Sequence, residues 1–99
     1  MDPDVIEISE LLVNRREGGR CRLAIERLNG FLEVVEEGKY NGRSVRQHIA
    51  RHPEADYELV IADYNQRLEQ LAAGGWLGYY GRAPKPIAAL EGYPPPPER

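Results

Sequence analysis

The chain has 99 residues, of which 41% are apolar and 29% charged, and its formal net charge is -3. This length fits a single domain with a modest core, and no apolar run approaches the roughly 18–20 residues that a membrane span needs. A single cysteine, Cys21, excludes an internal disulfide and a metal site built from several thiolates. The N-terminus is acidic where a secretory signal would be basic and then apolar, so we expect a cytoplasmic protein, or one inside a virion or a larger assembly.

Two helices are predicted before residue 38. Asp2-Pro3 suits the start of the first helix, with aspartate as N-cap and proline in the first turn, and Gly18-Gly19 ends it. The second helix is predicted over residues 20–37, with Gly30 inside it and Gly38 as its C-cap. Its apolar residues repeat at intervals of four and three: Cys21, Ile25, Leu28, Leu32 and Val35.

Two further helices are predicted in the middle of the chain. Ser44 suits the start of a short helix over residues 44–52, which Pro53 ends because the residue before a proline is pushed out of the α region. The next helix runs from about Glu54 to Ala73, and Gly74-Gly75 stops it. Its apolar residues show the same helical spacing: Tyr57, Ile61, Tyr64, Leu68 and Leu71, with Leu59 and Val60 broadening the buried side.

The segment after Gly75 is predicted to be extended. Residues 76–80 are rich in aromatic residues typical of strands, residues 81–86 contain the prolines of a loop, and residues 87–90 form a second short apolar run. This pattern predicts a small C-terminal β-hairpin or extended segment. Residues 91–99 form a proline-rich tail, expected in polyproline II conformation. We therefore expect one domain over residues 1–90, followed by the tail.

The order of these elements resembles a known family. The stretch RLEQLAAGGWLGYYGR, residues 67–82, is similar to the end of a winged-helix recognition helix that passes through a Gly-aromatic corner into the first wing strand. Over residues 20–90 the chain resembles a winged helix-turn-helix domain. The resemblance implies a mainly α-helical fold of three to four helices, with residues 57–73 as the recognition helix and residues 82–86 as the tip of the wing.

The same resemblance implies a transcriptional regulator that binds duplex DNA. The residues that would contact DNA are Arg43, Arg46, Arg51, Asn65, Arg67, Arg82 and Lys85. The charge of the predicted recognition helix departs from the family, because residues 54–69 hold five acids against Arg67 alone and acids near phosphates oppose binding. A DNA binder of this design would use its short helix and its wing, or would form a homodimer.

Positive charge is concentrated elsewhere in the chain. Residues 18–52 carry seven Lys/Arg against four acids, although the mixed total does not by itself predict nucleic-acid binding. Five arginines gather around the first predicted turn: Arg15, Arg16, Arg20, Arg22 and Arg27. A solvated surface accounts for such a cluster, and the alternative is docking to an acidic partner or to a phosphate.

Patterns for catalysis or metal binding are weak. His48 and His52 have a spacing that can serve one metal ion, but no third ligand is evident and surface histidines account for them. Arginines beside Cys21 would lower the pKa of its thiol, yet its place among apolar residues favours a core position. The glycines of residues 74–81 do not form a phosphate-binding fingerprint. We therefore predict no enzymatic activity, no metal ion and no cofactor.

The leading hypothesis is a small non-catalytic adaptor or inhibitor that docks on a protein partner. Trp76, Tyr79, Tyr80 and Arg82 are the candidate contacts, because Trp, Tyr and Arg dominate protein-binding hot spots. These aromatic residues are equally suited to capping the core, and the sequence leaves both roles open. The alternatives are the winged-helix DNA-binding regulator and a structural subunit of a larger assembly. The small size also suits an accessory protein of a phage, and no membrane association is expected.

Overall fold

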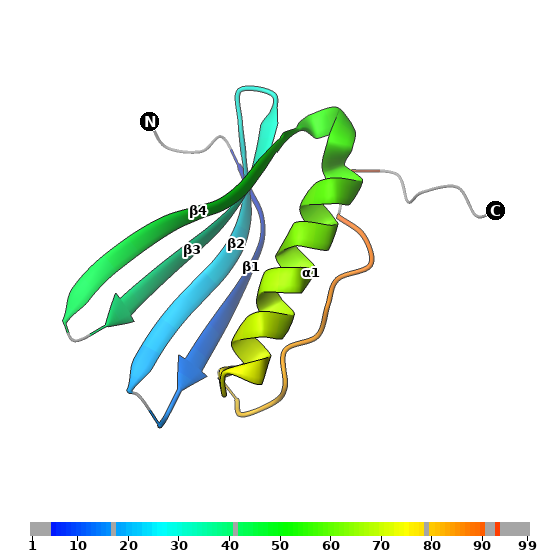
Figure 1. Ribbon diagram of the computed structural model, residues 1–99. Helices are drawn as coiled ribbons and strands as arrows, with labels where there is room; N and C mark the ends of the chain where they lie inside the picture. Colours follow the sequence, from blue (N-terminus) through cyan, green and yellow to red (C-terminus); the bar gives the residue numbers. More distant parts are fainter. Residues whose placement is uncertain (1–4, 17, 41, 79, 91–92, 94–99) are drawn as a thin grey trace.

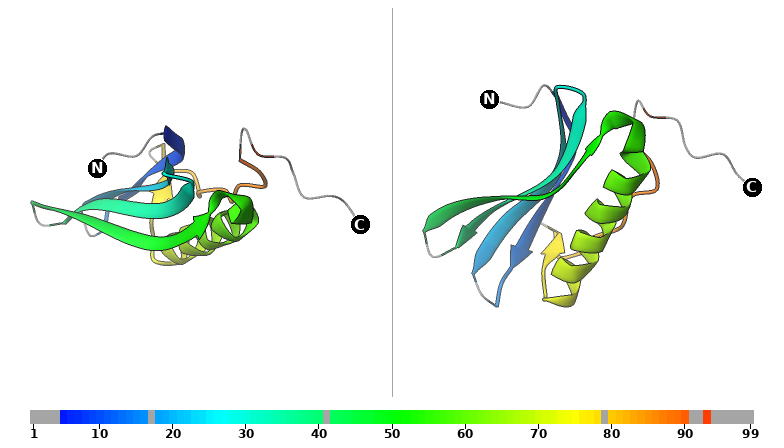
Figure 2. Two further views of the ribbon diagram at one scale, coloured as in Figure 1. Left: turned by 90° about the horizontal axis from the view of Figure 1, so that it is seen from above. Right: turned by 45° about the horizontal axis from the view of Figure 1, so that its top comes forward.

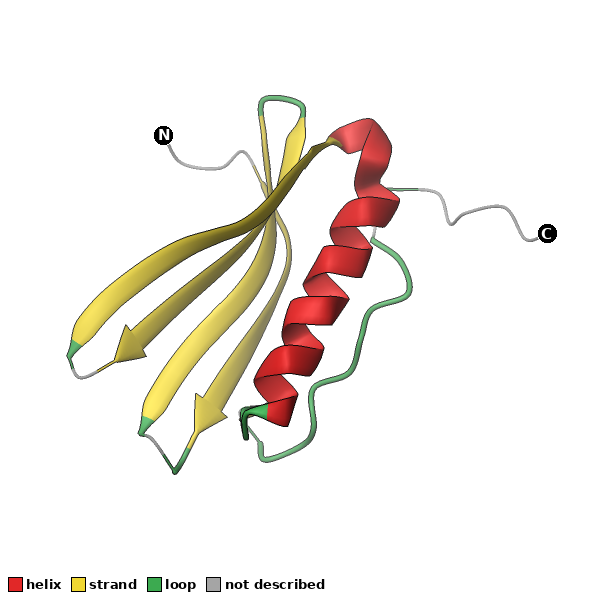
Figure 3. Ribbon diagram, viewed as in Figure 1, coloured by secondary structure: helices red, strands yellow, loops and turns green. Residues whose placement is uncertain are grey.

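Four long antiparallel strands follow one another along the chain and lead into one helix (Figures 1 and 3). The computed structural model describes residues 5–16, 18–40, 42–78, 80–90 and 93. The elements are β1 (Val5–Asn14), β2 (Gly19–Leu28), β3 (Phe31–Tyr40), β4 (Arg43–Pro53), a 3-10 turn (Glu54–Asp56), α1 (Tyr57–Ala73) and β5 (Leu77–Gly78). The sheet order is β4-β3-β2-β1-β5, so β4 and β5 form its edges.

The predicted winged helix-turn-helix domain and the mainly α fold are wrong, because a five-stranded antiparallel sheet dominates the structure. The described residues assigned to the first three helices lie in β1 to β4 and in the turns between these strands. The fourth predicted helix is confirmed as the 3-10 turn and α1, which Gly74 ends. Of the two forms predicted for the C-terminal segment, a β-hairpin or an extended segment, the hairpin is wrong, because β5 pairs with β1 and the described residues 80–90 form no strand.

The turn at Asn29-Gly30 is the reason that the helix predicted over residues 20–37 forms two strands instead. Leu28 pairs with Phe31, and both turn residues have positive φ values, 51° and 79°, as a two-residue type I′ hairpin turn requires. The turn divides the apparent helical seam into two strands. The residues of these strands that join the core cluster then alternate with the period of a strand: Cys21, Leu23 and Ile25 on β2, and Leu32 and Val34 on β3.

Helix α1 packs across one face of the sheet and encloses the core against it (Figure 2). Its buried residues form one stripe: Val60, Tyr64, Leu68 and Leu71. Leu59, which the sequence placed on the buried side, is 52% exposed. Trp76 closes the core where α1 ends, and its indole lies so close to Gly19 that a Cβ there would come within 2.8 Å of ring atom Cη2. α1 is neither long nor apolar enough to cross a membrane, and the described residues contain no other candidate.

The chain after β5 returns along α1 toward the start of the helix (Figure 1). The side chain of Asn65 holds this segment through two 2.8 Å hydrogen bonds, because it donates to the carbonyl of Ile87 and accepts from its backbone N–H. Leu90 is buried in the core, and Tyr93 packs on Tyr57 with ring centroids 5.3 Å apart. Most of the predicted proline-rich tail lies outside the described residues.

Candidate functional site

The face of the sheet opposite α1, which we call the outer face, is covered by no other element of the described chain (Figure 2). Strand register and alternation place its side chains in rows that cross the sheet from β1 to β4. The first row consists of Val13, Arg20, Lys39 and Ser44. The second row consists of Leu11, Arg22, Glu37 and Arg46. Both rows lie near the β1–β2 and β3–β4 turns, at the end of the sheet where α1 finishes (Figure 1).

Positive charge is concentrated on these rows, on the two adjoining turns and at the first residue of β4. Seven of the chain's 13 Lys/Arg residues lie there, and we call them the basic end: Arg15, Arg16, Arg20, Arg22, Lys39, Arg43 and Arg46. Five of the seven are exposed and form no ion pair with another described residue. The whole chain has a net charge of -3, so the basic end is one pole of an otherwise acidic molecule.

Arg20 and Lys39 face each other directly across β2 and β3. Like charges at opposite positions of antiparallel strands repel and destabilise the sheet. No described acid pairs with either side chain, and Ser44 follows Lys39 along the row on β4. An anion bound between the two cations would replace this repulsion with attraction.

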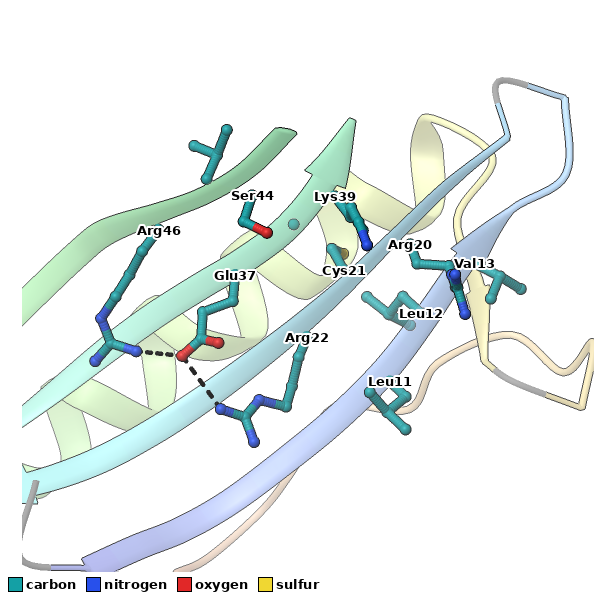
Figure 4. Close-up of a pocket in the computed structure, with 12 residues that line it drawn as sticks. Leu11, Leu12, Val13, Arg20, Cys21, Arg22, Glu37, Lys39, Ser44 and Arg46 are labelled. Atoms are coloured by element: carbon teal, nitrogen blue, oxygen red, sulfur yellow. Dashed lines mark hydrogen bonds and ion pairs between the residues drawn. The ribbon is translucent and has the colours of Figure 1, made fainter. Parts of the chain in front are cut away.

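The two rows line a hollow of about 680 Å³ (Figure 4). Its volume lies within the range of about 300–1,000 Å³ that is typical of small-molecule sites. Leu11 and Val13 border it on the β1 side, and Ser44 and Arg46 border it on the β4 side. The site therefore combines cations with an apolar border, of which Leu11 is 57% exposed.

Glu37 supplies negative charge to this hollow. Its Oε1 accepts hydrogen bonds from Arg22, at 3.2 Å, and from Arg46, whereas no described residue donates to its Oε2 (Figure 4). Arg46 also donates to Glu26, which is only 4% exposed. The hydrogen bond to Glu26 outweighs burial and raises the pKa of Arg46 above its usual value. Arg46 is thus held in place as a permanent cation.

The rest of the outer face is more nearly neutral. Glu33 lies 2.7 Å from Nδ1 of His48 and forms a 3.6 Å ion pair with Arg51. The guanidinium of Arg51 also lies over the ring of Phe31, 4.2 Å from its centroid. Arg51 therefore has an ion-pair partner and an aromatic contact within the fold, whereas Arg20 and Lys39 pair with no described acid.

A second hollow, of about 370 Å³, lies between β4 and α1. Its charged side chains are engaged with the fold. Nε2 of His52 lies 2.7 Å from Oδ2 of Asp63, Arg67 donates to Glu36 over 2.6 Å, and Arg51 pairs with Glu33. This hollow therefore offers less unsatisfied charge to a ligand than the basic end does.

The structure divides the predicted DNA-contacting residues among three places. Arg43, Arg46 and Arg51 lie along β4, and the first two belong to the basic end. Asn65 and Arg67 serve the fold, because Asn65 holds the C-terminal segment and Arg67 pairs with Glu36.

The remaining predicted DNA contacts, Arg82 and Lys85, are exposed on the C-terminal segment that runs along α1. They are not among the residues that line the hollow on the outer face. The predicted wing therefore does not extend the basic end.

The predicted protein-binding residues are also separated. Trp76 is 6% exposed and belongs to the core, whereas Tyr80 is 89% exposed. Arg82 is exposed too, and its carbonyl accepts a 2.7 Å hydrogen bond from Gly78. Tyr79 lies outside the described residues. Tyr80 and Arg82 are thus the described members of this group that a partner can reach.

The candidate metal ligands lie on opposite faces of β4. His48 is on the outer face and His52 faces α1, because the bulge at Ile49 shifts the register between them. Within the described part of the chain, no three His, Cys, Asp or Glu side chains are arranged to hold a metal ion. Cys21 is buried, and burial raises the pKa of its thiol to about 12, with a further contribution from the charge of Glu36.

Sequence reasoning found part of the basic end. It grouped Arg15, Arg16, Arg20 and Arg22 but included Arg27, which pairs with Glu54 at 3.6 Å. It missed Lys39, Leu11, Val13, Glu37 and Ser44 as members of one site. The missed signal is the alternation of residues 20–23, where arginines alternate with apolar residues as on a strand exposed on one face.

No protein-family model matches the chain, and comparisons with curated proteins and with solved structures find no significant match. The geometry of the outer face is therefore the basis on which a function is assigned.

Proposed function

We propose that the protein is a non-catalytic nucleic-acid-binding protein, which holds the sugar-phosphate backbone at the basic end of its outer face. The observation that carries this proposal is the pair formed by Arg20 and Lys39, two exposed cations that face each other and have no described counter-ion. Phosphate oxygens supply the missing negative charge. Binding of this kind requires no chemical step and also fits a cytoplasmic location.

The composition of the basic end supports phosphate as the group recognised. Four of the five cations that form no ion pair with another described residue are arginines, whose planar guanidinium groups match the geometry of phosphate oxygens. Ser44 adds a hydroxyl donor beside Lys39. Backbone contacts from Arg, Lys and Ser are typical of nucleic-acid interfaces.

The extent of the basic end supports a polymer over a small anion. Arg15, Arg16 and Arg43 are exposed on or beside the two turns, outside the residues that line the hollow. A single phosphate in the hollow would leave these cations without a partner, whereas a chain of phosphates can pass from one turn to the other. Each phosphate neutralised releases condensed counter-ions, which makes the binding favourable and dependent on salt.

Charge reversal tests the proposal. Lys39→Glu and Arg20→Glu should each weaken binding to a labelled nucleic acid about tenfold or more at about 0.1 M salt, and should reduce the slope of log K against log salt by about one. Binding is measured by fluorescence anisotropy with single-stranded and duplex oligonucleotides. Lys85→Glu is the matched control, because it makes the same charge change on the C-terminal segment.

Stability separates lost binding from lost folding. Lys39→Glu replaces a cross-strand repulsion with an attraction to Arg20, so the variant should be as stable as the wild type or more stable by about 0.2–1 kcal/mol. A variant that folds and no longer binds supports the site. Absence of binding by the wild-type protein to both oligonucleotides at low salt would refute the proposal.

A second function, docking on a protein partner, is favoured by one observation. Tyr80 is 89% exposed and lies close in sequence to exposed Arg82, and Tyr and Arg are enriched in binding hot spots. Tyr80→Ala should then abolish capture of a specific partner from the native host while nucleic-acid binding stays unchanged. If the Tyr80→Ala variant captured the same partner as the wild type, Tyr80 would not be part of a protein-binding site.

A further inference from the structure

We infer that the nucleic acid bound at the basic end is single-stranded, with its phosphates along the first row and an unpaired base against the second row. This inference rests on the proposed function and names the class of nucleic acid that the site takes. The two rows lie side by side in one hollow but differ in chemistry, and each suits a different part of a nucleotide.

The first row suits phosphate because it contains positive charge and no acid. Arg20 and Lys39 face each other, and Ser44 lies opposite Lys39 on β4. A phosphate on this row meets cations and a hydroxyl donor on adjacent strands.

The second row is poorly suited to phosphate, because Glu37 lies at its centre and repels anions. The same residue suits a base. Its Oε1 holds Arg22 and Arg46 in place, and guanidinium planes are surfaces on which unpaired bases stack. No described residue donates to its Oε2, which can therefore accept a hydrogen bond from an exocyclic amino group of a base.

Leu11 completes the surface for a base. It is 57% exposed and borders the hollow next to Arg22. An exposed leucine beside arginines offers an apolar contact to the face of a nucleobase, and the hollow of about 680 Å³ is large enough to admit one. Base faces are available in a single strand and are stacked inside a duplex.

A duplex uses this surface less well. Its backbones present phosphates, so a duplex laid across both rows brings negative charge toward Glu37 and leaves Leu11 without an apolar partner. A duplex is therefore held by the cations alone. A single strand gains the same phosphate contacts and adds contacts to its base, which is the usual combination in single-strand binding grooves.

The test compares three probes with the full chain. These are a labelled single strand of roughly 10 nucleotides of mixed sequence, the same strand annealed to its complement, and inorganic polyphosphate as an unlabelled competitor. We expect the single strand to bind about tenfold more tightly than the duplex. Polyphosphate should compete poorly per phosphate, because it has no bases.

Leu11→Ala isolates the contact to the base. It should weaken single-strand binding several-fold, leave duplex binding unchanged and preserve the salt dependence, since no phosphate contact is lost. Leu59→Ala is the matched control, because Leu59 is 52% exposed on α1 on the other side of the sheet. If Leu11 had only a structural role, Leu11→Ala would weaken the binding of the single strand and of the duplex equally.

The outcomes separate this inference from the proposed function. If the duplex binds as tightly as the single strand, or polyphosphate competes as well as the strand, the single-strand inference is overturned while binding at the basic end stands. If neither oligonucleotide binds, both fail. Tighter binding of the single strand that depends on Leu11 supports both.

Discussion

At the residue scale, the contact between Gly19 and Trp76 closes the core beneath the basic end. Gly19 is buried at the start of β2, and the indole of Trp76 occupies the space where a side chain would project. The backbone N–H of Trp76 donates to the carbonyl of Leu71, which fixes the approach of the chain after α1. A residue without a Cβ is therefore required at this position for Trp76 to be buried.

Gly19→Ala should lower the free energy of unfolding by about 1–3 kcal/mol, because the added methyl group overlaps the indole and the packed side chains must shift to make room for it. Urea unfolding followed by tryptophan fluorescence measures the change. Gly74→Ala is the control, since its φ of -84° suits alanine and its nearest new contact would be at 3.4 Å. Equal stability of the two variants would contradict this account.

Burial of two acidic groups predicts a loss of stability at high pH. Burial raises the pKa of Cys21 from 9.0 to about 12 and that of Tyr64 from 10.0 to about 12. The unfolded chain releases these protons at the ordinary pKa values, so above about pH 9 the native state binds more protons than the unfolded state. The free energy of unfolding should therefore fall as the pH rises from about 9 to about 12.

Urea midpoints measured across this range test the assignment. Cys21→Ala removes one of the two groups, so its stability should fall less steeply with pH than that of the wild type. The comparison uses slopes, because the substitution also changes packing at all pH values. Identical slopes would show that Cys21 does not contribute.

At the element scale, the C-terminal segment depends on one side chain of α1. Asn65 makes two hydrogen bonds with the backbone of Ile87, and Leu90 and Tyr93 pack farther along. The segment makes no ladder with the sheet in the described residues 80–90, so these side-chain contacts anchor it in place of a strand.

Asn65→Ala should loosen this segment without unfolding the sheet. Two net hydrogen bonds are worth about 1–3 kcal/mol, so the amide of Ile87 should exchange its hydrogen about tenfold faster or more. Hydrogen exchange measured by NMR should show little change in β2 and β3. Gln66→Ala, at an exposed neighbouring position, is the control, and unchanged exchange at Ile87 would contradict the role given to Asn65.

At the scale of the whole molecule, charge is divided between two sides. Four residues of the basic end lie on the outer face: Arg20, Arg22, Lys39 and Arg46. Helix α1 carries exposed Glu58 and Glu69 on the opposite side of the sheet. The molecule measures 41 × 35 × 18 Å, so these charges are separated by distances that salt screens strongly at about 0.15 M and weakly at about 0.01 M. The acidic side should oppose binding of a polyanion only in weak salt.

Replacing both acids, Glu58→Gln with Glu69→Gln, should strengthen nucleic-acid binding at about 0.01 M salt and leave it unchanged at about 0.15 M. Anisotropy titrations at the two salt concentrations measure the effect. A gain of equal size at both would mean that the acids act through direct contact with the ligand, contrary to the placement of the site on the outer face.

The sequence by itself determined the helix and part of the charge map. Apolar spacing and the Gly74-Gly75 stop located α1, because a helix is made of contacts between residues three and four positions apart. The arginines of residues 15–22 were likewise visible as neighbours along the chain. Asn29-Gly30 was a readable hairpin signal that the four-three spacing obscured.

Only the tertiary structure determines which residues lie together in the site. Strand pairing brings Lys39 opposite Arg20 and places Glu37 between Arg22 and Arg46. Neither arrangement follows from local periodicity, because a shift of register by one residue would send each side chain to the other face. The same non-local packing buried Trp76 and left Tyr80 exposed, although the two lie four residues apart and have similar chemistry.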